Sequence, residues 1–287
     1  MHLLLISIAC SVGVSILFKL ARRYQLDIGQ AVVINYLTAI TLCVLLLRPD
    51  PMSVLAGNTS FWVLGSLGVL LPSVFLIMGK AVEQAGIVRS DAAQRLSLLI
   101  PLLAAVFIFG ESVTGYKGYG IALALVALLC LLSRSKASTT ASTSPQHTSQ
   151  HGTLWLLIVW LGYGVIDILF KQLSKAGAQF AGSLVVSFAI AGVVMLTWLL
   201  LQRTRWSRRS LLSGILLGVL NFSNIYFYIR AHQHYAENPT LVFSAMNIGV
   251  ISLGTLIGAG FFREKLSWLN IVGIILAVAS ILLLFPR

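Results

Sequence analysis

Charged side chains inside long apolar stretches are the residues of this sequence that could do chemistry. Arg95 is the clearest case, because it stands with Gln94 inside the mainly apolar stretch 90–101. A charge within a membrane span is costly and usually faces the interior of a helix bundle. Since a guanidinium group suits oxyanions, we predict that Arg95, with Gln94 beside it, holds an anionic group of a substrate. The sequence supports a structural role for Arg95 equally well. In that role Arg95 pairs with Asp91 or Glu83, or its side chain extends to a membrane boundary.

Asp167 and Lys171 form a second pair of this kind. Asp167 lies deep in an apolar stretch, and Lys171 follows one helical turn later. The two side chains can therefore form an ion pair on one helix face. A neutralised structural pair is the favoured interpretation. The functional hypothesis is ion coupling, in which Asp167 exchanges protons during transport and Lys171 is its partner.

Amide and phenol side chains gather in the stretch 210–230. Asn221, Asn224 and Tyr228 are spaced three and four residues apart, so they fall on one face of a helix. Because lipid offers an asparagine no hydrogen bonds, we expect this face to point into a cavity. The other side chains predicted to line that cavity are Asn35, Tyr36, Tyr163 and Asn247. The alternative is hydrogen bonding between helices, worth about 1 kcal/mol or less per contact; for Asn221 and Asn224 we favour the cavity.

The histidines and cysteines do not form a recognisable metal or catalytic motif. His232 and His234 have no third ligand nearby in the sequence, so we interpret them as histidines at a membrane boundary. Cys10, Cys43 and Cys130 each lie in an apolar stretch and are interpreted as packing residues. The sequence contains no phosphate-binding loop, zinc-protease motif or nucleophile elbow. We therefore predict that the protein is not an enzyme and that it needs no cofactor or metal.

The elements that must position these residues are membrane-spanning helices. Hydrophobic residues make up 58% of the 287-residue chain and charged residues 10%, whereas a soluble protein carries about 25% charged residues. The net charge of +12 comes largely from Lys and Arg at the ends of apolar stretches, which anchors helices in a bilayer and does not indicate nucleic acid. Ten segments are predicted to be helices that span the bilayer. They cover approximately residues 3–20, 30–47, 61–82, 87–109, 115–133, 153–173, 181–202, 210–230, 239–262 and 268–285.

The chain is predicted to consist of two homologous halves, residues 1–133 and 153–287, joined by a flexible Ser/Thr-rich linker at 134–152. The sequence ILFK at 16–19 recurs at 168–171, and further matches follow in the same order. An odd number of helices in each half inverts the second half. The prediction is an all-α membrane protein with ten transmembrane helices in two inverted-topology five-helix repeats.

Helix-weakening residues occupy equivalent positions of the two halves. Pro101 in the fourth segment corresponds to Gly254 in the ninth, and matched interruptions of this kind point to a substrate site near the bilayer midplane. The glycine pairs Gly214-x-x-x-Gly218 and Gly254-x-x-x-Gly258 are predicted to let helices approach closely within the chain.

Gly110-Glu111 at the end of the fourth segment and Gly120 in the fifth, with Glu264 and Gly273 in the second half, resemble the drug/metabolite transporter superfamily, in particular its EamA-like ten-helix members. The resemblance covers the whole chain. It implies a secondary transporter, with export of amino-acid-like solutes as the implied activity. The proline of the fourth segment lies closer to the glutamate than is usual in the family, and more charge surrounds the third and fourth segments.

We therefore predict a multi-pass protein of a plasma membrane, of the bacterial inner-membrane type, that moves small polar or amphipathic metabolites by alternating access. Its partners would be a small-molecule substrate, the lipid bilayer and protons, and it would act as a monomer or homodimer. A lipid or polyprenyl-phosphate flippase, with Arg95 and Lys80 on the headgroup phosphate, is the alternative among transporters. A non-transporting receptor or assembly subunit is the alternative of another class, and the lack of a sizeable soluble domain speaks against it.

The orientation stays open in the sequence. The loops after segments 1, 3, 5, 7 and 9 carry most of the Lys and Arg, which predicts that both termini lie outside the cytoplasm. The family resemblance implies cytoplasmic termini instead.

Overall fold

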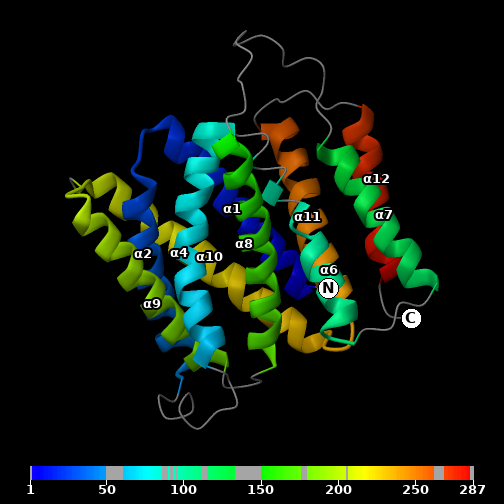
Figure 1. The fold of residues 1–287 in the computed structure, drawn as a ribbon, viewed down its shortest axis with the longest axis horizontal. Helices are drawn as coiled ribbons and strands as arrows, with labels where there is room; N and C mark the ends of the chain where they lie inside the picture. Colours follow the sequence, from blue (N-terminus) through cyan, green and yellow to red (C-terminus); the bar gives the residue numbers. More distant parts are fainter. Residues whose placement is uncertain are drawn as a thin grey trace. The chain divides into compact units, whose positions relative to one another are not determined.

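The computed structural model describes residues 2–49, 61–85, 90, 93–94, 96–110, 115–132, 150–175, 180–204, 206–261 and 268–284. Within these residues the regular structure is helical, and the helices follow one another along the chain as drawn in Figure 1. They are α1 (His2–Arg23), α2 (Ile28–Leu42) continued by the π-helix η1 (Cys43–Leu47), α4 (Phe61–Ala85), α6 (Leu99–Phe107), α7 (Gly115–Leu132), α8 (Gln150–Ser174), α9 (Phe180–Leu201), α10 (Arg208–His234), α11 (Pro239–Phe261) and α12 (Trp268–Leu284).

Apart from α6, which covers only Leu99–Phe107 of the predicted segment 87–109, the described helices correspond to the apolar segments predicted to span a bilayer. In the described part of the chain, six are long and apolar enough to cross a membrane, namely Ile28–Leu47, Phe61–Ala81, Gly152–Ser174, Phe180–Leu201, Arg208–His234 and Pro239–Gly258. Shorter apolar helices cover His2–Phe18, Gly115–Cys130 and Ile271–Leu284. The protein is therefore a multi-pass helical membrane protein. The predicted linker lies outside the described residues up to residue 149, and its last three residues begin α8.

The described helices form two compact units that do not coincide with the two halves predicted from the sequence. Unit 1 contains Met1–Leu76 and Ile168–His234, and unit 2 contains Ile77–Asp167 and Tyr235–Arg287. Each unit thus combines helices from both halves, and the chain passes between units inside α4, inside α8 and after α10. The homology of the halves stays a prediction.

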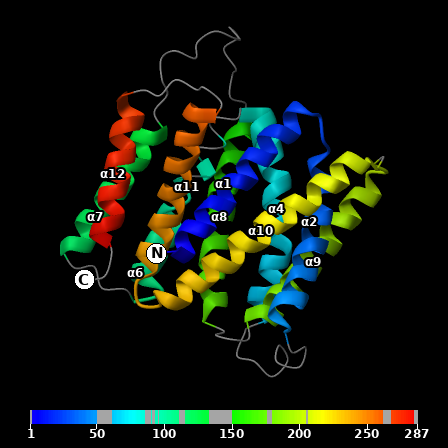
Figure 2. The same cartoon turned by 180° about the vertical axis from the view of Figure 1, so that it is seen from behind.

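In unit 1, α10 runs between α1 and α2 (Figure 2). A Cβ atom at Gly214 would lie 2.6 Å from the carbonyl oxygen of Ala31, and one at Gly218 would lie 2.5 Å from the Cβ of Thr38. Only a residue without a side chain permits this approach of α10 to α2. The close packing predicted for the Gly214–Gly218 pair is confirmed, and it lies within the chain.

The other side of α2 packs against α9. The rings of Tyr36 and Phe188 have centroids 6.2 Å apart, and the Cys43 thiol donates to the carbonyl of Ala181 at 3.3 Å. The beginning of α4 completes this layer, because Ser187 Oγ on α9 donates to the carbonyl of Leu64 at 3.3 Å. The unit is therefore held by apolar packing supplemented by hydroxyl and thiol bonds to backbone carbonyls.

In unit 2, α7 and α12 pair closely, and α11 packs against α6, α7 and α12. Ser280 Oγ on α12 donates to the carbonyl of Gly120 at 3.0 Å, and a Cβ at Gly120 would lie 2.8 Å from the side chain of Leu284. Gly254 on α11 differs from the pair on α10, since no described atom lies within 4 Å of where its Cβ would be. The predicted close packing at Gly254 is therefore not seen among the described residues.

Candidate functional site

Within its described residues, the fourth apolar segment contains a helix that is interrupted before Leu99. The amide of Ile100 donates to the carbonyl of Ser97 at 3.0 Å and not to that of Leu96, and α6 begins only at Leu99. Pro101 explains the break, since it has no N–H to donate to the carbonyl of Ser97, four residues earlier, and its ring crowds that carbonyl. The Ser97 carbonyl accepts from the amide of Ile100 instead, which would otherwise donate to Leu96. The carbonyl of Leu96 is thereby released from helical hydrogen bonding.

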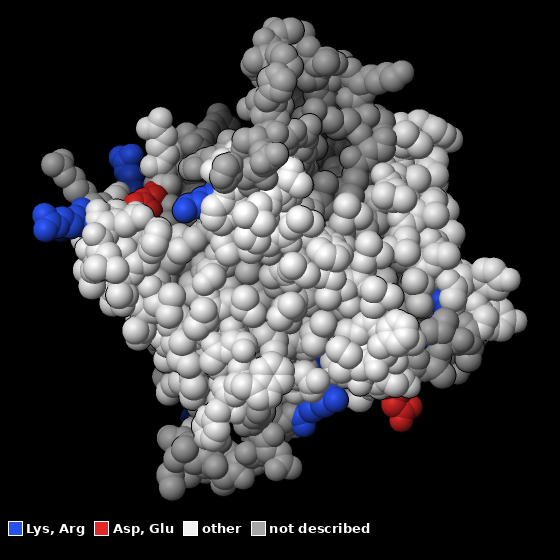
Figure 3. All heavy atoms as spheres, in the orientation of Figure 1, with Lys and Arg blue, Asp and Glu red and all other residues white. Residues whose placement is uncertain are grey.

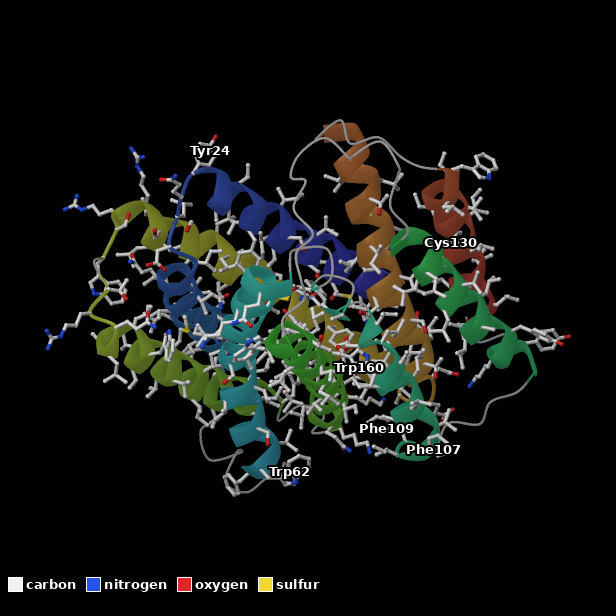
Figure 4. The ribbon with its side chains drawn as sticks, turned by 45° about the horizontal axis from the view of Figure 1, so that its top comes forward. Tyr24, Trp62, Phe107, Phe109, Cys130 and Trp160 are labelled. Carbon is white, nitrogen blue, oxygen red and sulfur yellow. The ribbon has the colours of Figure 1, made fainter. Side chains whose placement is uncertain are left out.

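The released carbonyl is bound by a side chain from α8. Trp160 Nε1 donates to the carbonyl oxygen of Leu96 at 3.0 Å, and Figure 4 shows this ring between α8 and α6. One turn further along α8, a Cβ at Gly164 would lie 2.6 Å from the Cβ of Ile100. A glycine therefore lets α8 approach close enough for the indole to reach the break.

Trp160 was missed by reasoning from the sequence. Tryptophan in membrane helices concentrates near the two interfaces, whereas Trp160 is the eleventh residue of α8, which runs Gln150–Ser174. A tryptophan in the middle of a span is the sequence signal that could have identified it. Its partner could not have been identified, because the backbone of Leu96 is a partner only where the fourth segment is broken.

Two of the predicted substrate residues lie at this break. Gln94 is half-buried directly before it, and its carbonyl accepts a hydrogen bond from Ser97 Oγ at 2.5 Å. Tyr163 is half-buried and follows Trp160 by three residues, so it lies on the neighbouring part of the same α8 face. Arg95, the residue predicted to hold an anion, lies outside the described residues, as does Asp91.

Asn247 engages its own helix. Its Nδ2 donates to the carbonyl of Phe243, one turn earlier on α11, at 3.1 Å, and its side chain is half-buried. Its place in a substrate cavity therefore stays a prediction.

In unit 1, Lys171 lies in a buried polar cluster at the ends of α8 and α10. The side chain is 3% exposed, and Nζ donates to the carbonyl of His232 at 3.5 Å. That carbonyl belongs to the last turn of α10, where carbonyls lack helical partners and a cation is favourable. Lys171 thus serves at least as a cap of α10. Asp167 on α8 is half-buried and has an interaction partner, and its ion-coupling role stays a prediction.

His232 has an environment that the sequence did not predict. It is fully buried, with its ring centroid 4.8 Å from that of Tyr228, and it lies in the last turn of α10, so its place at a membrane boundary stays a prediction. Tyr228 in turn meets Phe170 edge to face at 6.2 Å. Burial beside the Tyr228 ring, which itself packs against Phe170 of α8, places His232 in the interior of unit 1. Among the described residues, no group of three His, Cys, Asp or Glu side chains could hold a metal ion.

Two of the remaining predicted residues of unit 1, Asn224 and Tyr36, lie at helix contacts. Asn224 Oδ1 accepts a hydrogen bond from Ser7 Oγ of α1 at 2.8 Å, which is the contact that the packing alternative predicts. Tyr36 is buried against α9, and Asn221 is half-buried. Asn35 is 1% exposed, and its Oδ1 has no hydrogen-bond partner among the described residues.

Comparisons with known proteins agree with this architecture. Residues 150–285 match the EamA-like transporter family. A protein of Haemophilus influenzae described as an uncharacterized protein is 50% identical over 290 residues, which cover 99% of this chain and 98% of that protein. A solved crystal structure of a protein aligns with 98% of this chain and 94% of its own, with a TM-score of 0.71 and 13% identity. At that identity the solved structure shows the fold alone.

Proposed function

The chain belongs to the EamA-like transporter family, within the drug/metabolite transporter superfamily, and from this premise we propose that it is a secondary transporter of small polar or amphipathic metabolites. Amino-acid-like solutes are the proposed substrate class, export is the proposed direction, and alternating access between two inverted repeats is the proposed mechanism. The protein would catalyse no covalent chemistry and would draw its energy from a gradient.

The broken fourth segment is the observation that carries this proposal. Irregular backbone at membrane depth is tolerated only where it is buried in protein or lines a cavity. In many secondary transporters, discontinuous helices supply the backbone groups that bind substrate or coupling ions. Here the break releases the carbonyl of Leu96, and Trp160 holds it. Gln94 directly precedes the break, and Tyr163 follows Trp160 by three residues on α8. Both would contact the polar part of a substrate.

The proposed roles of the other residues follow their chemistry. Arg95, next to the break in the sequence, would bind a carboxylate of the substrate. Asn35 would accept a hydrogen bond through its unpartnered Oδ1. Asp167 would couple transport to protons, with Lys171 close to it on α8.

The test is flux into and out of proteoliposomes, measured with amino acids, sugars and nucleosides, with and without a proton gradient. Trp160→Phe keeps an aromatic ring but removes the donor to Leu96. An unsatisfied buried acceptor costs about 1–3 kcal/mol, so we expect transport to fall about tenfold. Trp62→Phe is the matched control, since Trp62 is exposed at the start of α4, and its transport should equal that of the wild type. Absence of saturable flux for every solute would contradict the proposal.

A lipid flippase is the second candidate, favoured by one contact in unit 2. Lys80 on α4 is exposed, and its Nζ lies 5.2 Å from the ring centroid of Trp155 on α8. An exposed ammonium held over an aromatic ring could bind a headgroup phosphate. Reorientation of a fluorescent anionic lipid by the proteoliposomes, lost in Lys80→Gln, would support this candidate over the metabolite transporter.

A further inference from the structure

One end of unit 1 is formed by two loops that are far apart in the sequence. The backbone N–H of Asp27 donates to Ser210 Oγ at 2.9 Å, and the backbone N–H of Ser207 donates to Gln30 Oε1 at 2.8 Å. Gln30 and Ser210 are each 1% exposed. The loop after α1 and the loop after α9 are therefore joined. We call residues 24–31 and 199–212 the basic end of unit 1.

The basic end has an uncompensated positive charge. Arg203, Arg208 and Arg209 are exposed, and Asp27 is the one acidic residue in these two sequence ranges. Its carboxylate already accepts hydrogen bonds from the backbone N–H of Gln30 at 3.2 Å and from Gln30 Nε2 at 3.0 Å. In the described part of the chain, none of the three guanidinium groups has a carboxylate partner. Figure 3 shows Lys and Arg side chains projecting where α9 and α10 meet in Figure 1.

Arginine is an unfavourable residue for the local structure at each of these three positions. Arg203 has a φ of +50° and follows the end of α9, where the amide of Thr204 donates to the carbonyl of Leu199 at 3.4 Å. This left-handed position after a helix favours glycine. Arg208 and Arg209 occupy the first turn of α10, which has no acidic residue and where the helix dipole disfavours positive charge. Their charges are better explained by a partner outside the chain.

The surroundings place the basic end at the depth of lipid headgroups. Tyr24 is 66% exposed and Trp206 is 47% exposed, and Figure 4 shows Tyr24 projecting outward after α1. Exposed tyrosine and tryptophan are typical of the membrane interface. Leu200, Leu201 and Leu212 are exposed apolar residues within a few positions of the arginines. The arginines are therefore flanked by exposed apolar side chains and by aromatic side chains of the type found at membrane interfaces.

We propose that the basic end of unit 1 binds the phosphate groups of anionic phospholipids through Arg203, Arg208 and Arg209. Guanidinium groups bind phosphate oxygens through paired N–H donors. Anionic membrane surfaces attract clustered arginines near a span in the same way. The partner is the lipid surface, so this inference is independent of the transported substrate.

The experiment measures binding of phosphatidylglycerol to the full-length protein in neutral detergent by native mass spectrometry. Phosphatidylcholine with the same acyl chains and inorganic phosphate are the comparison ligands. We expect the wild type to prefer phosphatidylglycerol to both. Each arginine should contribute about fivefold in affinity, so Arg203→Gln, Arg208→Gln and Arg209→Gln together should lower it on the order of a hundredfold. Equal binding of the two lipids, or binding of inorganic phosphate as tight as that of phosphatidylglycerol, would overturn the proposal.

Two further variants separate lipid binding from damage to the fold. Arg48→Gln is the matched control, because Arg48 is also exposed and also has a positive φ, of 44°, but lies at the other end of the continuous helix formed by α2 and η1. It should retain the affinity of the wild type. Arg203→Gly should weaken phosphatidylglycerol binding about fivefold while raising the thermal stability of the lipid-free protein, since glycine relieves the backbone strain. Unchanged binding in Arg203→Gly and in the triple variant would refute the inference.

Discussion

An alanine introduced at Gly218 would place its Cβ 2.5 Å from the Cβ of Thr38 and 2.9 Å from the carbonyl oxygen of Asn35. Carbon atoms in favourable contact lie about 3.5–4.0 Å apart, so α2 and α10 would have to separate by roughly 1 Å. The carbonyl oxygen of Asn35 belongs to the backbone, so this contact cannot be relieved by rotation of a side chain. Overpacking of this kind typically costs about 1–3 kcal/mol, which exceeds the gain of up to about 1 kcal/mol from replacing a helical glycine by alanine.

Gly65 on α4 provides the matched control. It is also helical and belongs to unit 1, but no described atom lies within 4 Å of where its Cβ would be. Gly65→Ala should therefore leave the free energy of unfolding unchanged or raise it by up to about 1 kcal/mol. The two substitutions are chemically identical, so their opposite signs would report the packing of α10 on α2.

The assay is reversible unfolding in mixed micelles, followed by tryptophan fluorescence, with size-exclusion chromatography to confirm that each variant is folded at the start. Gly218→Ala should lower the unfolding free energy relative to the wild type. A Gly218→Ala protein as stable as the wild type, or a Gly65→Ala protein destabilised to the same extent, would refute the reasoning from helix approach.

Three further predictions concern the contacts of unit 1, ion coupling and orientation. A double-mutant cycle of Ser7→Ala and Asn224→Leu should give a coupling energy of about 0.5–1 kcal/mol in the same unfolding assay; additive effects would show that their hydrogen bond contributes nothing. Asp167→Asn should express normally but lose the pH dependence of flux in proteoliposomes, and an unchanged pH profile would exclude proton coupling at Asp167. Gln202→Cys, in the exposed loop after α9, should be labelled by an impermeant maleimide only in inside-out vesicles, because the arginine-rich loop should be cytoplasmic; labelling only in right-side-out cells would reverse this orientation.

The positions of the helices could be predicted from the sequence because hydropathy alone determines them. A segment long and apolar enough to cross a bilayer must form a helix, since lipid leaves backbone groups no other partners. The prediction for 210–230, for example, corresponds to α10 at Arg208–His234. The role of Gly214 and Gly218 was equally predictable, because their spacing places two residues without side chains on one helix face.

The candidate site could be predicted only in part. Pro101 marked the fourth segment as weakened, and Gln94 lies beside the observed break. The partner of Trp160 could not be found in this way, because it is the backbone carbonyl of Leu96, and any residue type supplies the same carbonyl. Asn224 could be identified in the sequence as a polar residue of a membrane helix. Its partner Ser7 could not be identified, because the two residues are 217 positions apart in the sequence.

What the sequence by itself determined is the class of the protein: an apolar chain divided by charged loops into helices that span a membrane. The contacts between helices were decided only by the tertiary structure. The cap of α10 by Lys171, the interior position of His232 and the joining of the loop after α1 to the loop after α9 each depend on which helices are neighbours. The composition of a helix shows that one face must avoid lipid, but many partners can cover that face. Close approach at particular glycines and the released carbonyl of Leu96 select among those partners, and both exist only in the packed structure.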